Sequence, residues 1–188
     1  MIKNKIIPFL KYIIPVVIFL SSTAFAESSL TQIAVIGTYT NMRHTEEHSY
    51  GYTVKLWKQG NRVFGFILAS NGLSGDTPTG LLEDVKFGPE SGKLSFRAKL
   101  TTGLIYNNQV KKWIPSQDIF KFSGILNKDS LTGVLEISDA LLSDKSPVRE
   151  EIKLLFSVTE TRQLQTFSSY EDWKKMAKHI LKFRGPKY

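Results

Sequence analysis

An unbroken alternation of apolar and polar residues over Lys93–Leu100 constrains the fold more than any other feature of the chain. Successive side chains of a β-strand point to opposite faces, so this pattern predicts a strand with one buried and one solvated face. The same period recurs in four further segments, whose apolar positions begin at Tyr52, Phe120, Leu131 and Ile152. The chain is therefore expected to be mainly β.

Short polar turns separate neighbouring strands at Gln59–Asn61, Pro89–Gly92 and Asn127–Ser130. Connections this short favour antiparallel neighbours, because a parallel crossover needs a dozen or more residues. Residues 63–69 are apolar on both faces apart from Gly65, which predicts a strand covered on both sides. The pattern as a whole predicts strands over 31–40, 50–58, 62–69, 81–88, 93–101, 118–126, 131–138 and 150–158.

Eight sequential antiparallel strands can close on themselves, and closure removes both exposed sheet edges. We therefore predict an all-β fold: a single antiparallel up-and-down β-barrel of about eight strands, spanning 27–168. A two-sheet β-sandwich is the alternative architecture. A barrel of this size either is filled by its own side chains or holds one small ligand.

The C-terminal segment changes to helical spacing. Ser168 and Glu171 have the spacing of a capping box, and the residues after them form an apolar stripe with lysines on the other side. We expect 169–188 to form a basic amphipathic helix packed on the barrel. The basic side of helix 169–184 also predicts a weak contact with an anionic membrane or another envelope component.

The first 26 residues have the pattern of a signal peptide. Lys3 and Lys5 precede an apolar run that reaches Leu20, and small residues follow at 24 and 26. We expect cleavage near Ala26 and export to the periplasm or out of the cell. Removing 26 residues from 188 leaves 162, which suits one domain.

Composition excludes several classes of site. The chain has no cysteine, so disulfides, thiolate metal sites and a cysteine nucleophile are ruled out. Its net charge of +8 comes largely from the leader lysines and from the segment 171–188. A nucleic-acid-binding protein usually spreads its positive charge over a docking face, so no nucleic-acid partner is expected.

The tripeptide Gly37-Thr38-Tyr39, the exported β-meander and the late helix together resemble the calycin barrels, the lipocalins and avidins. Those families carry Gly-x-Trp in the first strand, where this chain has Tyr39. Lipocalins also pack a helix against the outside of the barrel. The resemblance implies a barrel of this architecture and a small apolar ligand.

Two polar segments are the candidate sites. If the segment 41–50 is extended, His44, Glu46 and His48 point to one side and form a metal-binding triad; a polar surface loop is the alternative. The loop 70–80 contains three glycines and is expected either to form a rim at the barrel or to be a plain long turn. The residues predicted to contact a ligand are Asn41, His44, Glu46, His48, Asn71, Asp76, Thr77 and Thr79.

Neither a phosphate-binding loop nor a nucleophile elbow fits these segments, and we assign no catalytic residue and no cofactor. The expected function is an exported, non-catalytic binding protein for a small hydrophobic or amphipathic ligand. One alternative is an envelope protein-interaction module with a filled barrel. Another is a metal-dependent enzyme centred on His44, Glu46 and His48. A buried void would favour ligand binding, and its expected lining is Phe64, Phe66, Phe96 and Phe122.

Overall fold

The computed structural model describes residues 32–73, 77–101, 104–108, 110–115, 118–139 and 146–180. The predicted signal peptide and Asp76 lie outside these residues. The helices are α1 (Val158–Arg162) and α2 (Tyr170–Ile180). The strands are β1 (Ala34–Thr40), β2 (Arg43–His44), β3 (His48–Gln59), β4 (Arg62–Leu73), β5 (Thr79–Phe87), β6 (Lys93–Lys99), β7 (Leu104–Asn107), β8 (Lys112–Pro115), β9 (Asp118–Leu126), β10 (Ser130–Asp139) and β11 (Val148–Phe156).

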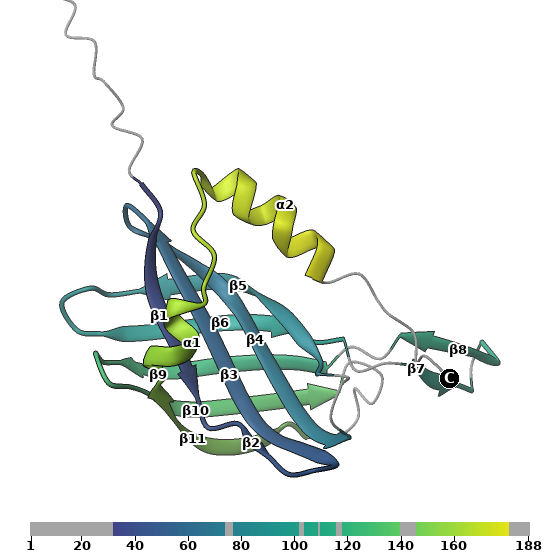
Figure 1. The fold of residues 1–188 in the computed structure, drawn as a ribbon. Coiled ribbons are helices and arrows are strands. Elements are labelled where there is room, and N and C mark those ends of the chain that lie inside the picture. Colours follow the sequence, from purple (N-terminus) through teal and green to yellow (C-terminus); the bar gives the residue numbers. More distant parts are fainter. Residues whose placement is uncertain are drawn as a thin grey trace, which may run out of the picture. The chain divides into compact units, whose positions relative to one another are not determined.

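Eight of these strands form a closed antiparallel barrel, as the alternation predicts (Figure 1). Around the barrel the order is β1, β3, β4, β5, β6, β9, β10 and β11, so each strand pairs with the next barrel strand in the chain. β1 closes the sheet because it pairs with both β3 and β11. The β-sandwich alternative is therefore wrong. β2 is an extra strand that pairs with β3 outside the barrel.

The sequence pattern misses the shortest elements. β2 has two residues, and β7 and β8 have four each, too few for an alternation to stand out. The expected strand 150–158 ends at Phe156, because Ser157 caps α1 there and its side chain accepts a hydrogen bond from the Glu160 backbone N–H.

The barrel interior is filled at its middle level. Phe96 and Phe122 stack inside it, with ring centroids 5.0 Å apart. Several inward side chains are completely buried, so among the described residues the interior is closely packed around them. They are Val54, Leu56, Ile67, Ala98, Leu131, Leu135 and Leu154.

Two glycines make room for one of these rings. Gly124 on β9 lies directly opposite Gly133 on β10. A Cβ atom on Gly124 would come within 2.6 Å of the Phe122 ring, and one on Gly133 within 2.9 Å. The ring of Phe122 therefore lies against a strip of backbone that only glycine can provide.

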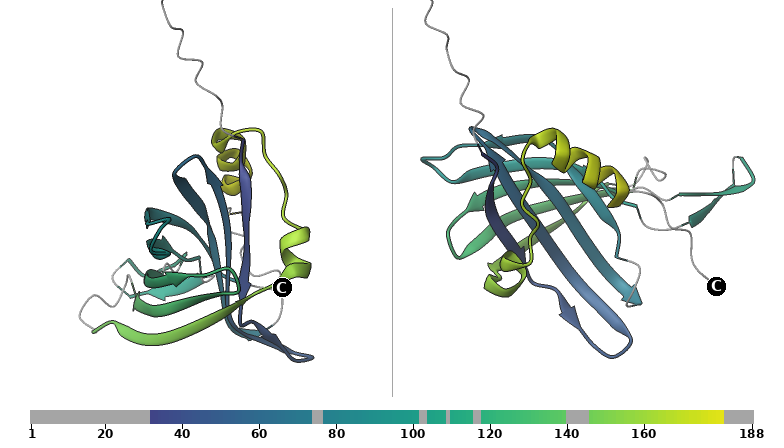
Figure 2. Two further views of the ribbon diagram at one scale, coloured as in Figure 1. Left: turned by 90° about the vertical axis from the view of Figure 1, so that its left-hand side faces the viewer. Right: turned by 45° about the horizontal axis from the view of Figure 1, so that its top comes forward.

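α2 lies on the outside of the barrel (Figures 1 and 2). A second apolar cluster lies between this helix, β3 and β4. Because Phe64 and Phe66 point outward here while Val63 and Ile67 point inward, β4 is covered on both faces, as predicted. The expectation that Phe64 and Phe66 line an internal void is wrong. The buried members of the outer cluster are Ile33, Trp57, Phe64, Phe66, Phe167, Trp173 and Ala177.

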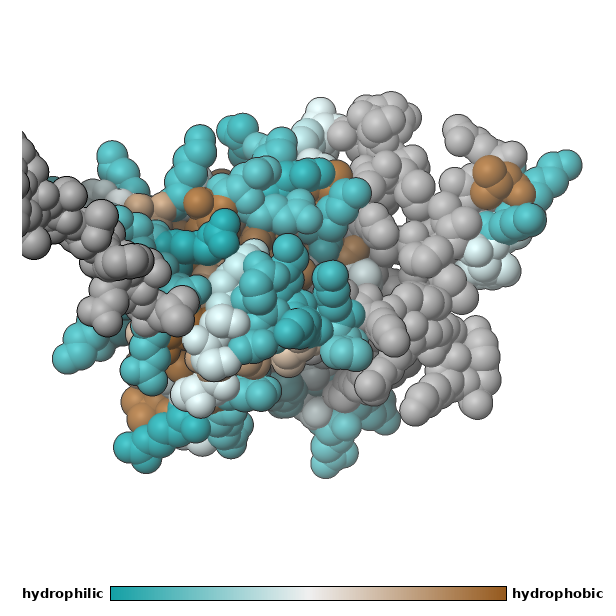
Figure 3. All heavy atoms as spheres, turned by 90° about the horizontal axis from the view of Figure 1, so that it is seen from above, coloured by the Kyte–Doolittle hydropathy of each residue, from teal (hydrophilic) through white to brown (hydrophobic). Residues whose placement is uncertain are grey.

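α2 uses its apolar face for this packing. Trp173 and Ala177 are buried, and the guanidinium of Arg62 lies 4.4 Å from the centre of the Tyr170 ring. Figure 3, which looks down on the helix, shows mainly hydrophilic side chains over its outer side. Among the helices of the described part of the chain, none is long and apolar enough to cross a membrane.

The helix begins one residue later than the capping box predicts. The backbone N–H of Asp172 donates to Ser169 Oγ at 3.2 Å, so Ser169 is the N-cap. The Asp172 carboxylate accepts hydrogen bonds from the hydroxyls of Ser168 and Ser169. These bonds, with a contribution from Lys175, lower the pKa of Asp172. Asp172, rather than Glu171, is therefore the acidic residue that takes part in this N-terminal cap.

Adjacent residues on β10 give a matched test of the inside–outside assignment. Leu135 is fully buried and Val134 is 39% exposed. We expect Leu135→Ala to lower the free energy of unfolding by about 2–5 kcal/mol, because it leaves a cavity, and Val134→Ala to lower it by less than about 1 kcal/mol. Urea unfolding of the two variants measures both. Equal losses would contradict the assignment.

The capping box makes a pH-dependent prediction. Since folding lowers the pKa of Asp172, its ionised form stabilises the protein above the usual carboxyl pKa near 4, and that contribution is lost as the pH falls through the folded pKa. Asp172→Asn should lower the melting temperature at pH 7, with a smaller difference from wild type at about pH 3. Glu171→Gln is the control and should change little at either pH. A larger loss of melting temperature in Glu171→Gln than in Asp172→Asn would contradict this and assign the cap to Glu171, as the sequence predicted.

Candidate functional site

The barrel has two chemically different ends. At the turn end, short turns at 60–61, 88–92 and 127–129 join neighbouring strands. At the loop end lie the start of β3, the end of β4 and the start of β5. The described ligand-contact candidates all lie at the loop end: Asn41, His44, Glu46, His48, Asn71, Thr77 and Thr79. Asp76 lies outside the described residues.

Strand pairing brings the two candidate segments, 41–50 and 70–80, together. Tyr50 lies opposite both Arg43 on β2 and Asn71 on β4. The backbone N–H of Ala69 donates to the Pro78 carbonyl at 3.0 Å, which holds the chain before β5 beside β4. The two polar segments of the sequence therefore lie on neighbouring strands.

The segment 41–50 is not extended, so the geometric basis of the metal triad is wrong. β2 and β3 form a hairpin in which His44 lies opposite Ser49, and His44 Nδ1 is 2.9 Å from Ser49 Oγ. His48 lies on the other face, where its ring stacks on Tyr50. Across the described residues, no three His, Asp or Glu side chains gather closely enough to hold a metal ion.

Two other candidates bond to the chain itself. The Asn41 side-chain oxygen accepts a hydrogen bond of 2.7 Å from the Tyr52 backbone N–H. Thr79 is buried, and its hydroxyl donates to the Thr77 carbonyl at 3.1 Å. Both side chains hold the loop end in shape.

At the loop end, β3 and β11 meet directly in a contact that the sequence did not predict; we call this contact the seam. β1 leaves the barrel after Thr40, and beyond that point the Tyr52 hydroxyl on β3 donates to the Glu150 carboxylate on β11 at 2.6 Å. The Tyr52 ring also meets Phe120 edge-on. Burial, followed by this hydrogen bond and the carboxylate charge, raises the pKa of Tyr52 well above its usual value. The phenol therefore stays protonated at neutral pH and able to donate this hydrogen bond between β3 and β11.

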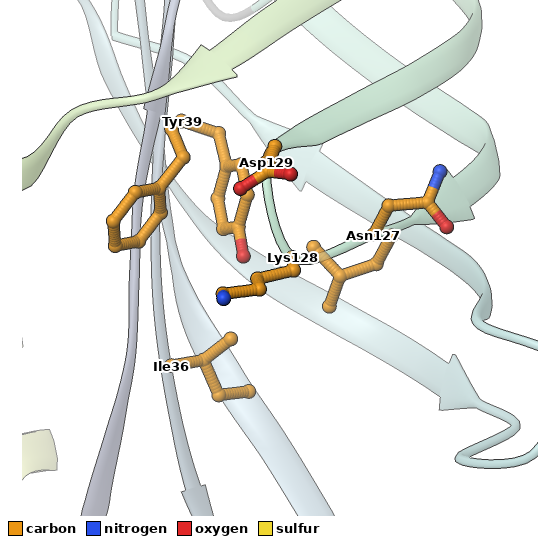
Figure 4. A pocket seen from close by; sticks show the side chains of 7 residues that line it. Ile36, Tyr39, Asn127, Lys128 and Asp129 are labelled. Atoms are coloured by element: carbon orange, nitrogen blue, oxygen red, sulfur yellow. The ribbon is translucent and has the colours of Figure 1, made fainter.

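A pocket of about 340 Å³ lies at the turn end (Figure 4). Apolar side chains from β1, β9 and β11 form its walls, and the turn after β9 forms its polar rim. Sequence reasoning named none of these as site residues, although the Gly37-Thr38-Tyr39 tripeptide pointed to Tyr39. The lining residues are Ile36, Tyr39, Leu126, Asn127, Lys128, Asp129 and Phe156.

A β-bulge shapes this pocket. Val35 pairs opposite Trp57 and Gly37 opposite Leu56, so Ile36 between them has no direct partner on β3. Gly37 has a φ of +149°, and a Cβ there would come within 2.4 Å of the Phe156 ring. Glycine is thus needed both for the backbone angle and for the close approach of Phe156.

Tyr39 brings a buried polar group to the pocket wall. It is 2% exposed and meets the Phe156 ring edge-on, with centroids 5.6 Å apart. Burial, with a smaller contribution from the Asp129 carboxylate, raises the pKa of Tyr39. At neutral pH the pocket therefore presents a neutral phenol.

A second hollow, of about 330 Å³, lies where β4 and β5 separate. Their ladder has only the pairs Phe66–Leu81, Ile67–Gly80 and Leu68–Thr79. Tyr170 and Trp173 of α2 line the gap, and the buried indole Nε1 of Trp173 has no hydrogen-bond partner among the residues that the structure describes.

Comparison with known proteins assigns no function to either hollow. The chain matches no family model, no curated protein and no solved structure. The closed eight-stranded barrel is consistent with a calycin-like architecture, so the resemblance rests on the arrangement of strands.

The Tyr52–Glu150 seam gives a prediction at alkaline pH. Because folding raises the pKa of Tyr52, its contribution is present below the usual tyrosine pKa near 10 and is lost as the pH rises through the folded pKa. Tyr52→Phe should lower the free energy of unfolding by up to about 1 kcal/mol at pH 7 and make the decline above pH 10 shallower.

Tyr50→Phe is the matched control, because Tyr50 lies two residues away and is 44% exposed. Urea unfolding at pH 7 and pH 11 compares the variants. If the free energy of unfolding of Tyr52→Phe falls between pH 7 and pH 11 as much as that of wild type, the role of the seam is contradicted.

Proposed function

We propose that the protein is an exported, non-catalytic binding protein for a small amphipathic molecule, and that the molecule binds in the turn-end pocket. The observation that carries this proposal is the combination of apolar walls and a charged rim in one hollow. Export rests on the leader pattern of residues 1–26.

The size of the pocket favours a small ligand. Its volume of about 340 Å³ lies at the low end of the range of about 300–1,000 Å³ for ligand pockets. Ile36, Leu126 and Phe156 offer contacts to a hydrocarbon chain or ring.

The rim favours a ligand with a polar head. Lys128 offers an ammonium group and Asp129 a carboxylate, beside the buried phenol of Tyr39 (Figure 4). An anionic head beside Lys128 is attracted by its charge, whereas Asp129 disfavours a head placed on its side. A short anionic amphiphile is therefore the ligand class that these groups support best.

The filled interior supports a site at the end of the barrel over one at its centre. Side chains such as Val54, Ile67 and Leu135 are completely buried, so a ligand at their level would require the core to repack. The polar loop-end residues remain the second place where a ligand contact is proposed.

Octanoate is a suitable probe of the turn-end pocket. We expect its titration to shift the amide resonances of Ile36, Tyr39 and Lys128 in a two-dimensional NMR spectrum. Lys128→Ala should weaken octanoate binding several-fold, because it removes the cation at the rim. Lys153→Ala, on the exposed outer face of β11, is the control and should leave the affinity unchanged.

Two outcomes would overturn this assignment. Shifts confined to residues such as Asn41, His48 and Asn71 would place the ligand at the loop end. Absence of binding by octanoate and by its neutral analogue octanol, in a protein with an intact fold, would remove the pocket as a site for this ligand class.

A second candidate function is an envelope protein-interaction module with a filled barrel. The lack of accessible surface at the middle level of the interior favours it, because such a barrel acts as a rigid scaffold. The metal-dependent enzyme is not carried forward, since His44 and His48 point to opposite faces of their hairpin.

A further inference from the structure

The hairpin of β7 and β8 exposes aromatic side chains to an unusual degree. Tyr106 lies opposite Trp113, and their rings meet edge-on with centroids 5.6 Å apart. Trp113 is 65% exposed, Tyr106 48% and Val110 55%. The other two tryptophans, Trp57 and Trp173, are 1% and 2% exposed.

Two adjacent lysines place positive charge beside these rings. Lys111 and Lys112 are exposed and join Val110 to Trp113. Lys111 has a φ of +50°, so it turns the chain back into β8. The segment 104–115 contains no Asp or Glu.

We propose that this hairpin docks on the surface of an anionic lipid bilayer, with Tyr106 and Trp113 at the level of the headgroups. Tyrosine and tryptophan favour that level because each ring has an apolar body and a polar end. Lys111 and Lys112 are attracted to anionic lipids.

The two lysines fit a protein partner less well than the aromatic side chains do. Lysine is depleted at protein–protein interfaces, whereas a basic surface is the usual complement of anionic lipid. Two adjacent lysines within the aromatic patch therefore favour the bilayer.

The hairpin is also better placed for this contact than α2. The apolar residues Trp173 and Ala177 of the helix are buried against the barrel, so α2 would have to leave the barrel to insert them. Tyr106, Val110 and Trp113 are exposed in the folded protein and need no such rearrangement.

Trp113 provides a direct readout. Trp113 is the exposed one of the three tryptophans, and an exposed indole emits at longer wavelength than a buried one. The long-wavelength edge of the tryptophan fluorescence spectrum therefore reports on Trp113. With the full chain, we expect vesicles of equal parts phosphatidylglycerol and phosphatidylcholine to shift that edge to shorter wavelength. Brominated lipids should quench it. Pure phosphatidylcholine vesicles, or 0.5 M salt, should greatly reduce both effects.

Variants in the same full chain separate the hairpin from the leader and from α2. The double variant Tyr106→Ala/Trp113→Ala, and separately Lys111→Glu/Lys112→Glu, should each lower the fraction that cosediments with anionic vesicles several-fold. Val134→Ala, an exposed position on β10, is the control and should cosediment like wild type. Circular dichroism checks that each variant keeps the barrel.

Two results would overturn the proposal. One is cosedimentation of the aromatic double variant equal to that of wild type, which would assign any membrane binding to another segment. The other is an unmoved emission edge with anionic vesicles, which would show that Trp113 does not enter the lipid surface.

Discussion

The structure depends on the two-sided pairing of β1. This strand hydrogen-bonds to β3 along most of its length and to β11 near Tyr39 and Thr40. Without it, β3 and β11 would be free edges of an open sheet, and the interior would be exposed along that side. The pairing with β11 covers few residues, so the Tyr52–Glu150 hydrogen bond beyond Thr40 extends the closure to the loop end.

Closure of the barrel and the shape of the pocket have a common origin in β1. The bulge at Ile36 turns its side chain inward between Val35, which packs outside, and Gly37. Gly37 then admits the Phe156 ring from β11. The same irregularity that fits β1 between two partners leaves a hollow beside Tyr39, where the turn after β9 supplies charge. A change that regularised β1 would therefore alter the pocket as well as the barrel.

Because the interior is packed with side chains, binding sites are expected at the ends and on the surface of the barrel. A barrel whose central side chains have no accessible surface acts as a rigid support. On this support the turn-end pocket and the exposed β7–β8 hairpin are proposed to serve different ligands, one a small molecule and the other a lipid surface. The two proposals are compatible: a protein held at a membrane by its hairpin would keep its pocket available for amphiphiles.

Local periodicity determined which residues form strands and which of their faces are apolar. Alternation along a strand is a property of neighbouring residues, so the inward positions of Leu94, Phe122 and Leu135 could be predicted from the sequence. Tertiary structure alone decided that the strands close into a barrel instead of a sandwich, because closure depends on the pairing of the first and last strands, 34–40 and 148–156.

The same distinction explains the candidate sites. Polar residues near one another in sequence suggested a metal triad, but a hairpin places His44 and His48 on opposite faces. The pocket combines Ile36, Asp129 and Phe156, which are far apart in sequence. No local pattern could bring them together, since their proximity arises from strand pairing around the barrel. The sequence by itself determined the strands and their apolar faces; the packing of distant strands decided where a ligand can fit.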